Sequence, residues 1–408
     1  MTAREYPVFT VTPKAERSLR AGHPWVYGEE VTAVEGAYQN GDMVDVVSNK
    51  GRYLGTGWGN DHSKIRVRII SRNANDTFDE AFFRRRVCYA LNYRKTVMGP
   101  VDYRCCRLIF GEADQFPGLT VDRFENILVT QVLSLGMERR KDWVYRALVE
   151  LLREDDEQID AIYERNDVAI RTLEGLEQGK GFYQMEGLKT DLSGHVTITE
   201  NGIKYDVDYI EGQKTGFFLD QKYNRQAAAK LARGRRVLDC FTHTGAFALN
   251  AAAAGAEHVT AVDVSAFALE LAAENGKRNG LTNLDYKCAD VFDLLTEMAK
   301  EKKCDYDYII LDPPAFTKSR ATAKNAYHGY KEINRKAMRL LPRGGYLATC
   351  SCSHFMTDEM FRKMLQEAAL DAGVTLRQIE ARQQAPDHPI LPEVPETDYL
   401  KFYLLQVV

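Results

Sequence analysis

From about residue 235 to the end of the chain, short apolar runs alternate with longer segments in which apolar residues recur every three to four positions. The short runs predict strands, and the longer segments predict helices of about 10–15 residues. Strands that alternate with such helices predict a parallel, doubly wound sheet and therefore an α/β fold. The strands are expected at residues 235–241, 258–264, 284–290, 306–314, 344–353, 375–382 and 399–408.

The first 190 residues follow a different pattern. Residues 43–48 and 64–70 alternate between apolar and polar positions, which predicts strands of a small β-rich domain. Residues 78–98 have helical spacing, and strands, a helix at 138–154 and a further strand follow them, which predicts an α+β unit. We therefore expect three domains, at residues 1–73, 74–190 and 191–408.

Composition narrows the class of protein. Of the 408 residues, 45% are apolar and 27% charged, as in ordinary globular proteins. No apolar run reaches the roughly 18 residues that a transmembrane helix needs, and the N-terminus lacks the apolar core of a secretory signal. The eight cysteines are scattered and show no repeated CxxC pair, which argues against a metal site. We expect a cytoplasmic protein with no membrane partner and no metal.

Charge is unevenly distributed along the chain. Residues 1–110 contain 17 Lys and Arg against 12 Asp and Glu, a balance of +5, whereas the remainder contains 37 against 46, a balance of −9. In residues 64–69 the period of two places Lys64, Arg66 and Arg68 on one face of a strand. A row of cations suits a phosphate backbone, although an exposed strand with ordinary surface charge is the competing explanation.

Acidic residues stand at the ends of four successive predicted strands, namely Asp239, Asp263, Asp290 and Asp312. Ligands of doubly wound sheets bind at these carboxyl ends. Each aspartate taken alone could cap the next helix, but capping explains four in succession poorly. The set resembles class I S-adenosylmethionine-dependent methyltransferases. That resemblance implies that the first turn holds the methionine part of the cofactor, that Asp263 and Asp290 hold its ribose and adenine, and that Asp312 faces the substrate.

The first of these turns excludes a common alternative. It reads Asp239-Cys240-Phe241-Thr242-His243-Thr244-Gly245 and contains one glycine, without the GxGxxG of a dinucleotide site or the lysine of a P-loop. A dinucleotide-dependent oxidoreductase is therefore disfavoured.

The fifth of these strands ends in two thiols, Cys350 and Cys352. A thiolate that adds to carbon six of a pyrimidine makes carbon five nucleophilic enough to attack a methyl sulfonium. Two residues apart, both thiols point the same way if the strand continues that far. A free cysteine is also a common buried residue, so the chemistry depends on the neighbouring Asp312-Pro313-Pro314.

Longer motifs extend the resemblance over nearly the whole chain. LRAGHPWVY and GDMVDVV with IRVRII, over about residues 5–72, resemble a PUA domain. FGEADQFPGLTVDRF, TGFFLDQKYNR, VLDCFTHTGAFAL, LDPPAF, TCSCSHFM and APDHP resemble the PUA-containing cytosine-5 methyltransferases of large-subunit (23S) ribosomal RNA. The resemblance implies a Rossmann-like methyltransferase domain, S-adenosylmethionine as cofactor and 23S rRNA as partner. It implies Cys352 as nucleophile and Asp312 as contact to the target base. It implies a cofactor site made by Phe218, Asp220, Gln221, Arg225, Asp239, Phe241, Thr244, Gly245, Asp263, Asp290 and Asp312.

One departure and several alternatives stay open. Many RNA cytosine-5 methyltransferases carry a second cysteine after the fourth strand, where this chain reads DPPAF. Product release then needs another base, for which Cys350 and Asp312 are candidates. The rivals are methylation of uridine at carbon five, whose enzymes read SCNP, methylation of guanine N7, and a non-catalytic RNA-binding protein. Methylation of adenine N6 is disfavoured, because those enzymes prefer the motif NPPY where this chain reads DPPAF. A homodimer also remains open.

Overall fold

The computed structural model describes residues 5–301, 304–317 and 322–408, which form two compact units. Unit 1 comprises residues 1–198, 207–219 and 386–397, and unit 2 comprises residues 199–206, 220–385 and 398–408. Within the described ranges, no helix combines the length and the apolar character that crossing a membrane requires. The predicted boundaries at 73/74 and 190/191 stay predictions.

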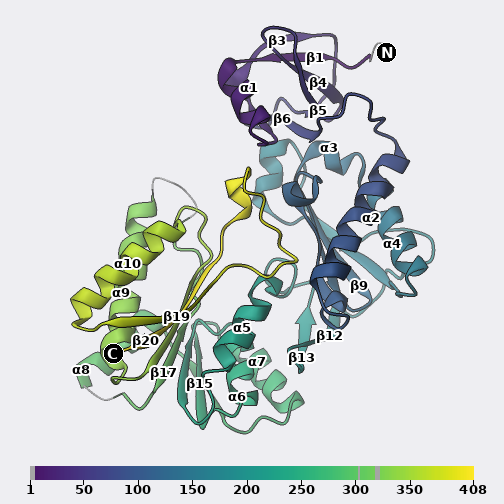
Figure 1. Ribbon diagram of the computed structural model, residues 1–408. Coiled ribbons are helices and arrows are strands. Elements are labelled where there is room, and N and C mark those ends of the chain that lie inside the picture. The colour runs from purple at the N-terminus through teal and green to yellow at the C-terminus, as the bar shows by residue number, and fades with distance from the viewer. Residues whose placement is uncertain (1–4, 302–303, 318–321) are drawn as a thin grey trace. The chain divides into compact units, whose positions relative to one another are not determined.

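Unit 1 begins with a six-stranded sheet in the order β2-β6-β5-β4-β1-β3, drawn in purple in Figure 1. Strands β1 and β4 are parallel, and the other pairs are antiparallel. Alternate residues such as Phe9, Val44 and Val67 form its core with Leu19 of the short helix. The elements are β1 (Val8–Val11), α1 (Pro13–Arg20), β2 (Trp25–Tyr27), β3 (Val31–Glu35), β4 (Met43–Ser48), β5 (Tyr53–Gly59) and β6 (Ile65–Ser71).

The second sheet of unit 1 has the order β11-β10-β9-β8-β7, with β9 and β10 parallel. Helices α2 and α4 pack against one another and follow the predicted positions closely (Figure 1). The α+β prediction for this region is consistent with this arrangement. The elements are α2 (Glu80–Val97), β7 (Cys105–Phe110), β8 (Leu119–Phe124), β9 (Ile127–Val132), α3 (Leu135–Glu138), α4 (Lys141–Glu154), β10 (Ala161–Arg165) and β11 (Lys180–Phe182). A hairpin of β12 (His195–Glu200) and β13 (Ile203–Asp208) follows.

Unit 2 is built on a seven-stranded sheet in the order β16-β15-β14-β17-β18-β20-β19. Five neighbouring strands are parallel, as predicted, whereas β20 lies antiparallel between β18 and β19. The order reverses between β14 and β17, and such a switch point is where open α/β sheets bind ligands. The strands are β14 (Arg236–Cys240), β15 (His258–Asp263), β16 (Leu284–Cys288), β17 (Tyr308–Leu311), β18 (Tyr346–Ser351), β19 (Leu376–Arg382) and β20 (Lys401–Val407).

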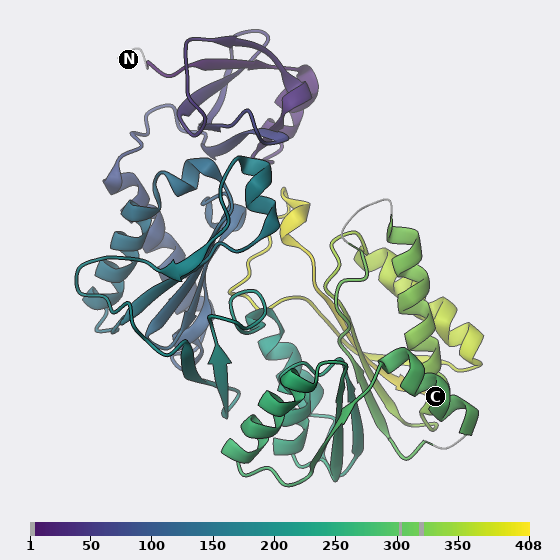
Figure 2. The ribbon, with the colours of Figure 1, turned by 180° about the vertical axis from the view of Figure 1, so that it is seen from behind.

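Helices cover both faces of this sheet, as both views show (Figure 1, Figure 2). Because successive residues of a strand face opposite ways, Val237 packs in the core with α5 and α6, and Leu238 packs in the core with α8, α9 and α10. The helices are α5 (Lys222–Ala229), α6 (Ala246–Ala253), α7 (Ala266–Arg278), α8 (Val291–Glu301), α9 (Ala323–Leu340) and α10 (Asp358–Ala372). The α/β prediction for this region is confirmed.

Candidate active site

The turn that leaves β14 is organised around the buried carboxylate of Asp239. Its Oδ2 atom accepts hydrogen bonds from the Thr242 hydroxyl at 2.5 Å and from the Ala248 N–H at 2.9 Å, which ties the strand to α6. Its Oδ1 atom is buried and has no hydrogen-bond partner among the described residues. Burial, reinforced by the nearby carboxylates of Asp312 and Asp263, raises the pKa of Asp239 to about 7. A buried oxygen without a partner is a place for a ligand's donor group.

The rest of the turn has an unusual backbone. Phe241, His243 and Gly245 have φ values of 63°, 51° and 83°, in the left-handed region. Glycine is needed at position 245, because a Cβ there would lie 2.9 Å from the Cβ of Ala272. Non-glycine residues in this region store strain, which concentrates at ligand sites. The half-buried Thr244 belongs to the same turn.

Asp263, the last residue of β15, fastens this turn from the next strand. Its Oδ2 atom accepts a hydrogen bond from the His243 N–H at 2.9 Å, and its Oδ1 atom accepts one from the Ser265 N–H at 3.0 Å. A carboxylate oxygen has a further lone pair, so these bonds leave acceptor capacity for ribose hydroxyls. The structure therefore brings Asp239, the first turn and Asp263 together.

Asp290 occupies a more ordinary position. Its Oδ1 atom accepts hydrogen bonds from the N–H groups of Phe292 and Asp293, at 2.7 and 3.1 Å, and the residue is exposed. This is the pattern of a helix N-cap, here at the start of α8. The capping explanation thus accounts for the contacts seen at Asp290, and its contact to adenine stays a prediction.

Asp312 follows β17 and faces two side chains from other elements. Its Oδ1 atom accepts a hydrogen bond from the Gln221 amide at 3.1 Å, and the Cys350 thiol is a further hydrogen-bond partner. Burial and the charge of Asp220 raise the pKa of Asp312 to about 6, against the opposing charge of Arg225. Burial also raises the pKa of the Cys350 thiol, which is fully enclosed, so Cys350 is held in its protonated form.

Cys352 differs from Cys350 in its surroundings. Strand β18 ends at Ser351, so Cys352 lies just beyond the strand and does not continue its alternation. Its side chain is half-buried, and its sulfur lies 4.0 Å from the carbonyl oxygen of Pro313, the residue after Asp312. The more accessible thiol is therefore next to the end of β17.

Three of the predicted cofactor residues, Asp220, Gln221 and Arg225, are buried polar residues just before and within α5. Asp220 accepts a hydrogen bond from the Tyr399 hydroxyl at 2.6 Å, and Gln221 accepts one from the Asn224 amide at 2.7 Å. Arg225 forms a buried ion pair with Glu200 at 2.6 Å. Phe218 belongs to unit 1, and its part in the site stays a prediction.

Sequence reasoning missed several of these groups. Glu200 and Tyr399 lie far along the chain from their partners, and no local spacing connects them. Lys401 is 4% exposed and lies on the strand that pairs with β18, where Ser351 is its register partner. The sequence feature that could have pointed to Lys401 is that it is a single lysine within the apolar run 399–408.

The three predicted RNA-contacting cations are placed differently from one another in unit 1. Lys64 is exposed, just before β6. Arg66 forms an ion pair with Asp61, whereas Arg68 pairs with Glu112 at 3.4 Å and with Glu174 at 2.8 Å. The charges of both arginines are thus compensated within the unit, and a contact to RNA stays a prediction for all three residues.

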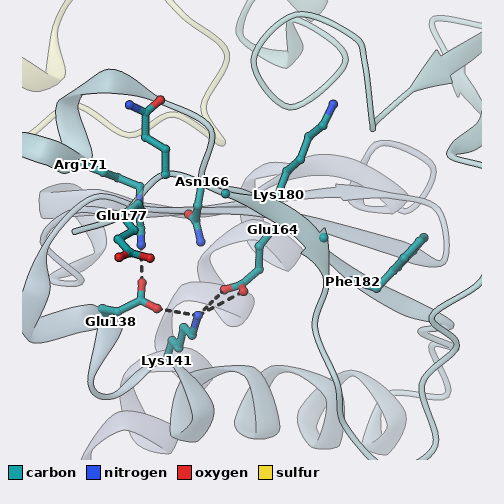
Figure 3. A pocket seen from close by; sticks show the side chains of 11 residues that line it. Glu138, Lys141, Glu164, Asn166, Arg171, Glu177, Lys180 and Phe182 are labelled. Carbon is teal, nitrogen blue, oxygen red and sulfur yellow. Dashed lines mark hydrogen bonds and ion pairs between the residues drawn. The ribbon is translucent and has the colours of Figure 1, made fainter.

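Unit 1 also contains a cavity of about 280 Å³, which Figure 3 shows from close by. Lys141 pairs there with Glu138 at 2.7 Å and with Glu164 at 2.8 Å, and Arg171 pairs with Glu138 at 3.0 Å (Figure 3). The charged groups at its base compensate one another, and none of the predicted site residues lines it.

Comparison with known proteins decides the family. Residues 182–405, more than half of the chain, match the family described as S-adenosylmethionine-dependent methyltransferase. The chain belongs to the S-adenosylmethionine-dependent methyltransferases. Residues 9–72 of the methyltransferase match a PUA-like domain, which confirms the interpretation of the first sheet.

Relatives of this methyltransferase span nearly its whole length. A protein of Pseudoalteromonas atlantica is 40% identical over 98% of this chain and 99% of its own. A protein of Aeromonas salmonicida is 42% identical over 95% of this chain and 96% of its own. Both are named ribosomal RNA large subunit methyltransferase I. A homodimer stays a prediction.

Solved structures share the fold of the methyltransferase. A candidate SAM-dependent methyltransferase from Streptococcus mutans is 22% identical, has a TM-score of 0.81, and is matched over 98% of this chain and 100% of its own. A second candidate methyltransferase, solved with S-adenosylhomocysteine, is also 22% identical, with a TM-score of 0.82 and the same coverage. The Rossmann-like prediction for the catalytic part is confirmed.

The residues at the strand ends fit the cofactor of this family. S-adenosylmethionine carries an ammonium group and two ribose hydroxyls, all hydrogen-bond donors. The buried Oδ1 atom of Asp239 has no partner of its own, and Asp263 retains acceptor capacity. These two carboxylates would hold those donors.

Proposed function

We propose that this methyltransferase modifies large-subunit ribosomal RNA, and that it forms 5-methylcytidine in 23S rRNA with Cys352 as the nucleophile. The names of full-length relatives at 40–42% identity support the substrate class, and the PUA-like domain supports binding to RNA. The structure has all eight cysteines as thiols and not as disulfides, which supports action in the reducing cytoplasm.

The observation that carries the choice of carbon five is the accessible thiol beside the end of β17. S-adenosylmethionine supplies an electrophilic methyl group. The Cys352 thiolate adds to carbon six of cytosine and places electron density on carbon five, which then takes the methyl group. A base removes the proton from carbon five, the carbon–sulfur bond breaks, and the thiolate is regenerated.

Asp312 is the base that we propose for this last step. Its carboxylate is adjacent to the segment that carries Cys352, and a pKa of about 6 makes it a stronger proton acceptor than an ordinary aspartate. Cys350, the other candidate, is fully enclosed and is held as a neutral thiol that already hydrogen-bonds Asp312. Methyl transfer should therefore rise with pH through about 6, and Asp312→Asn should lose this rise and about 10²–10⁴-fold in rate.

A trapping experiment tests the nucleophile together with the identity of the methylated nucleobase. In a 23S rRNA transcript with 5-fluorocytidine in place of cytidine, carbon five has no proton to release, so the adduct should persist. The native chain with S-adenosylmethionine should then migrate with the RNA on a denaturing gel. Cys352→Ser should not, whereas the matched Cys350→Ser should still form the adduct.

The alternatives have distinct outcomes in the same assay. Trapping by a 5-fluorouridine transcript, but not by 5-fluorocytidine, would assign the activity to uridine. Methylation by Cys352→Ser at the native rate would assign it to a base nitrogen such as guanine N7. A chain that binds S-adenosylmethionine and RNA but transfers no methyl group would be a non-catalytic binding protein.

A further inference from the structure

Lys401 is a lysine almost wholly withdrawn from solvent at the first position of β20. Its ammonium group donates hydrogen bonds to the carbonyl oxygen of Ser353 at 2.7 Å and to that of Tyr399 at 2.8 Å. Lys401 is also the register partner of Ser351 at the end of β18. Lys401 therefore holds the backbone on both sides of Cys352, its own backbone through strand pairing at Ser351 and its ammonium group through the hydrogen bond at Ser353.

The carboxylates near this ammonium group already have other partners. Asp398 is exposed and accepts a hydrogen bond from Gln383 at 3.2 Å, and Asp358 is exposed and forms an ion pair with Arg362 at 2.8 Å. The acceptors of its two hydrogen bonds are neutral carbonyl oxygens. A buried charge without a close counter-charge is costly, so this lysine gains from any negative group that forms next to it.

Cys352 is the chain neighbour of Ser353, whose carbonyl oxygen accepts a hydrogen bond from that ammonium group at 2.7 Å. Burial lowers the pKa of Lys401 to about 8, and the charges of Asp398, Cys352 and Asp358 act in the opposite direction. Two other titratable groups, Tyr330 and Cys350, also interact with Cys352, and burial raises the pKa of both, so they stay neutral near pH 7. Among these described groups, Lys401 carries a positive charge.

We propose that Lys401 is a positioning residue, whose buried ammonium group stabilises the thiolate of Cys352 and fixes the backbone that aims it at the substrate. This inference rests on the proposed role of Cys352 as nucleophile. A neighbouring cation favours a thiolate over a thiol, and the thiolate is the reactive form. Lys401 acts in its ammonium form and transfers no proton in the reaction.

The first test follows the reactivity of Cys352 with iodoacetamide as a function of pH in the full chain. Tandem mass spectrometry separates the label on Cys352 from that on Cys350. In Lys401→Met the midpoint of labelling should rise by about one pH unit, which makes labelling near pH 7 about tenfold slower. Lys401→Arg, which retains the charge, should restore a midpoint near that of the native chain. The matched control is the exposed Lys363→Met, which should leave the midpoint unchanged.

Thermal unfolding and calorimetry with S-adenosylmethionine establish that each variant is folded. An unchanged midpoint in folded Lys401→Met overturns the proposal, as does a shift of the same size in Lys401→Arg. A purely structural lysine would alter stability but not the pH at which Cys352 reacts.

A second test needs no substitution of the lysine. Coupling between two groups is reciprocal, so loss of the thiolate should lower the pH at which Lys401 titrates. Trace labelling of lysines with acetic anhydride across a pH series, read by mass spectrometry, should show this shift in Cys352→Ser. An identical titration of Lys401 in both proteins overturns the proposal even if Lys401→Met fails to fold.

Neither test uses RNA, so the two proposals fail separately. If the titrations of Lys401 and Cys352 are coupled but Cys352→Ser still methylates RNA, the lysine–thiolate pair is retained and Cys352 is not the nucleophile. Methylation that requires Cys352, with no shift in either titration, would retain the nucleophile and remove Lys401 from this role.

Discussion

The carboxylate of Asp239 is expected to destabilise the cofactor-free protein at neutral and alkaline pH. Its pKa is about 7 in the folded chain, against 3.8 for an ordinary aspartate, because burial disfavours the charged form. The folded state therefore binds more protons than the unfolded state between about pH 4 and pH 7, and stability falls as pH rises through this window. A difference of about three pH units corresponds to about 4 kcal/mol, fully expressed above pH 7.

Asp239→Asn removes this penalty while it preserves much of the local geometry. The amide oxygen can still accept the hydrogen bonds from Thr242 and Ala248, and the amide nitrogen takes the place of the oxygen that lacks a partner. At pH 8 we expect the cofactor-free variant to unfold at higher temperature and to be more stable by a few kcal/mol, with the difference vanishing near pH 4. The same variant should bind S-adenosylmethionine more weakly, by about 1.5–3 kcal/mol, because a charged acceptor is lost.

The assay is urea unfolding of the cofactor-free chain at a series of pH values from 4 to about 8.5, paired with calorimetric titration of S-adenosylmethionine at pH 8. Asp290→Asn is the matched control, since that carboxylate is exposed and asparagine caps helices equally well. It should not make the chain more stable at pH 8. A variant at position 239 that is less stable than the native chain at pH 8, or whose stability difference does not depend on pH, would refute the reasoning.

Three further outcomes are expected. Asp263→Ala should weaken binding of S-adenosylmethionine by about 1.5–3 kcal/mol in calorimetry, and unchanged affinity would remove that carboxylate from the site. Glu200→Gln should lower the free energy of unfolding in urea by about 3–5 kcal/mol, because the buried ion pair with Arg225 is then broken; a loss below 1 kcal/mol would contradict this. Lys64→Ala should reduce the slope of log RNA affinity against log salt concentration by up to about 0.7–0.9, with unchanged stability. Arg68→Ala should mainly destabilise unit 1, because Arg68 pairs with Glu112 and Glu174. A reduced slope in Arg68→Ala, with no change of slope in Lys64→Ala, would show that Arg68 is the residue that contacts RNA.

Much of the catalytic part of this chain could be predicted from local sequence pattern. The alternation of apolar runs and helical segments after residue 235 predicted the strands of the sheet, because burial on both faces of a parallel strand is visible in a few consecutive residues. The same reasoning placed Asp263 and Asp312 at strand ends, where the structure has them. In residues 64–70 the period of two likewise predicted β6.

Only the tertiary structure decided which of these side chains act on one another. Local spacing did not distinguish Asp290, which caps a helix on the surface, from Asp239, whose raised pKa depends on enclosure by α6 and two other carboxylates. It could not show that Arg68 pairs with Glu112 and Glu174, or that Lys401 reaches the carbonyl of Ser353, since these partners are tens of residues apart. It also did not show that β20 lies antiparallel between β18 and β19. Periodicity reports which face of an element is buried, whereas strand order and the path of the chain bring distant charges together, and those contacts set the pKa and the reactivity of each group.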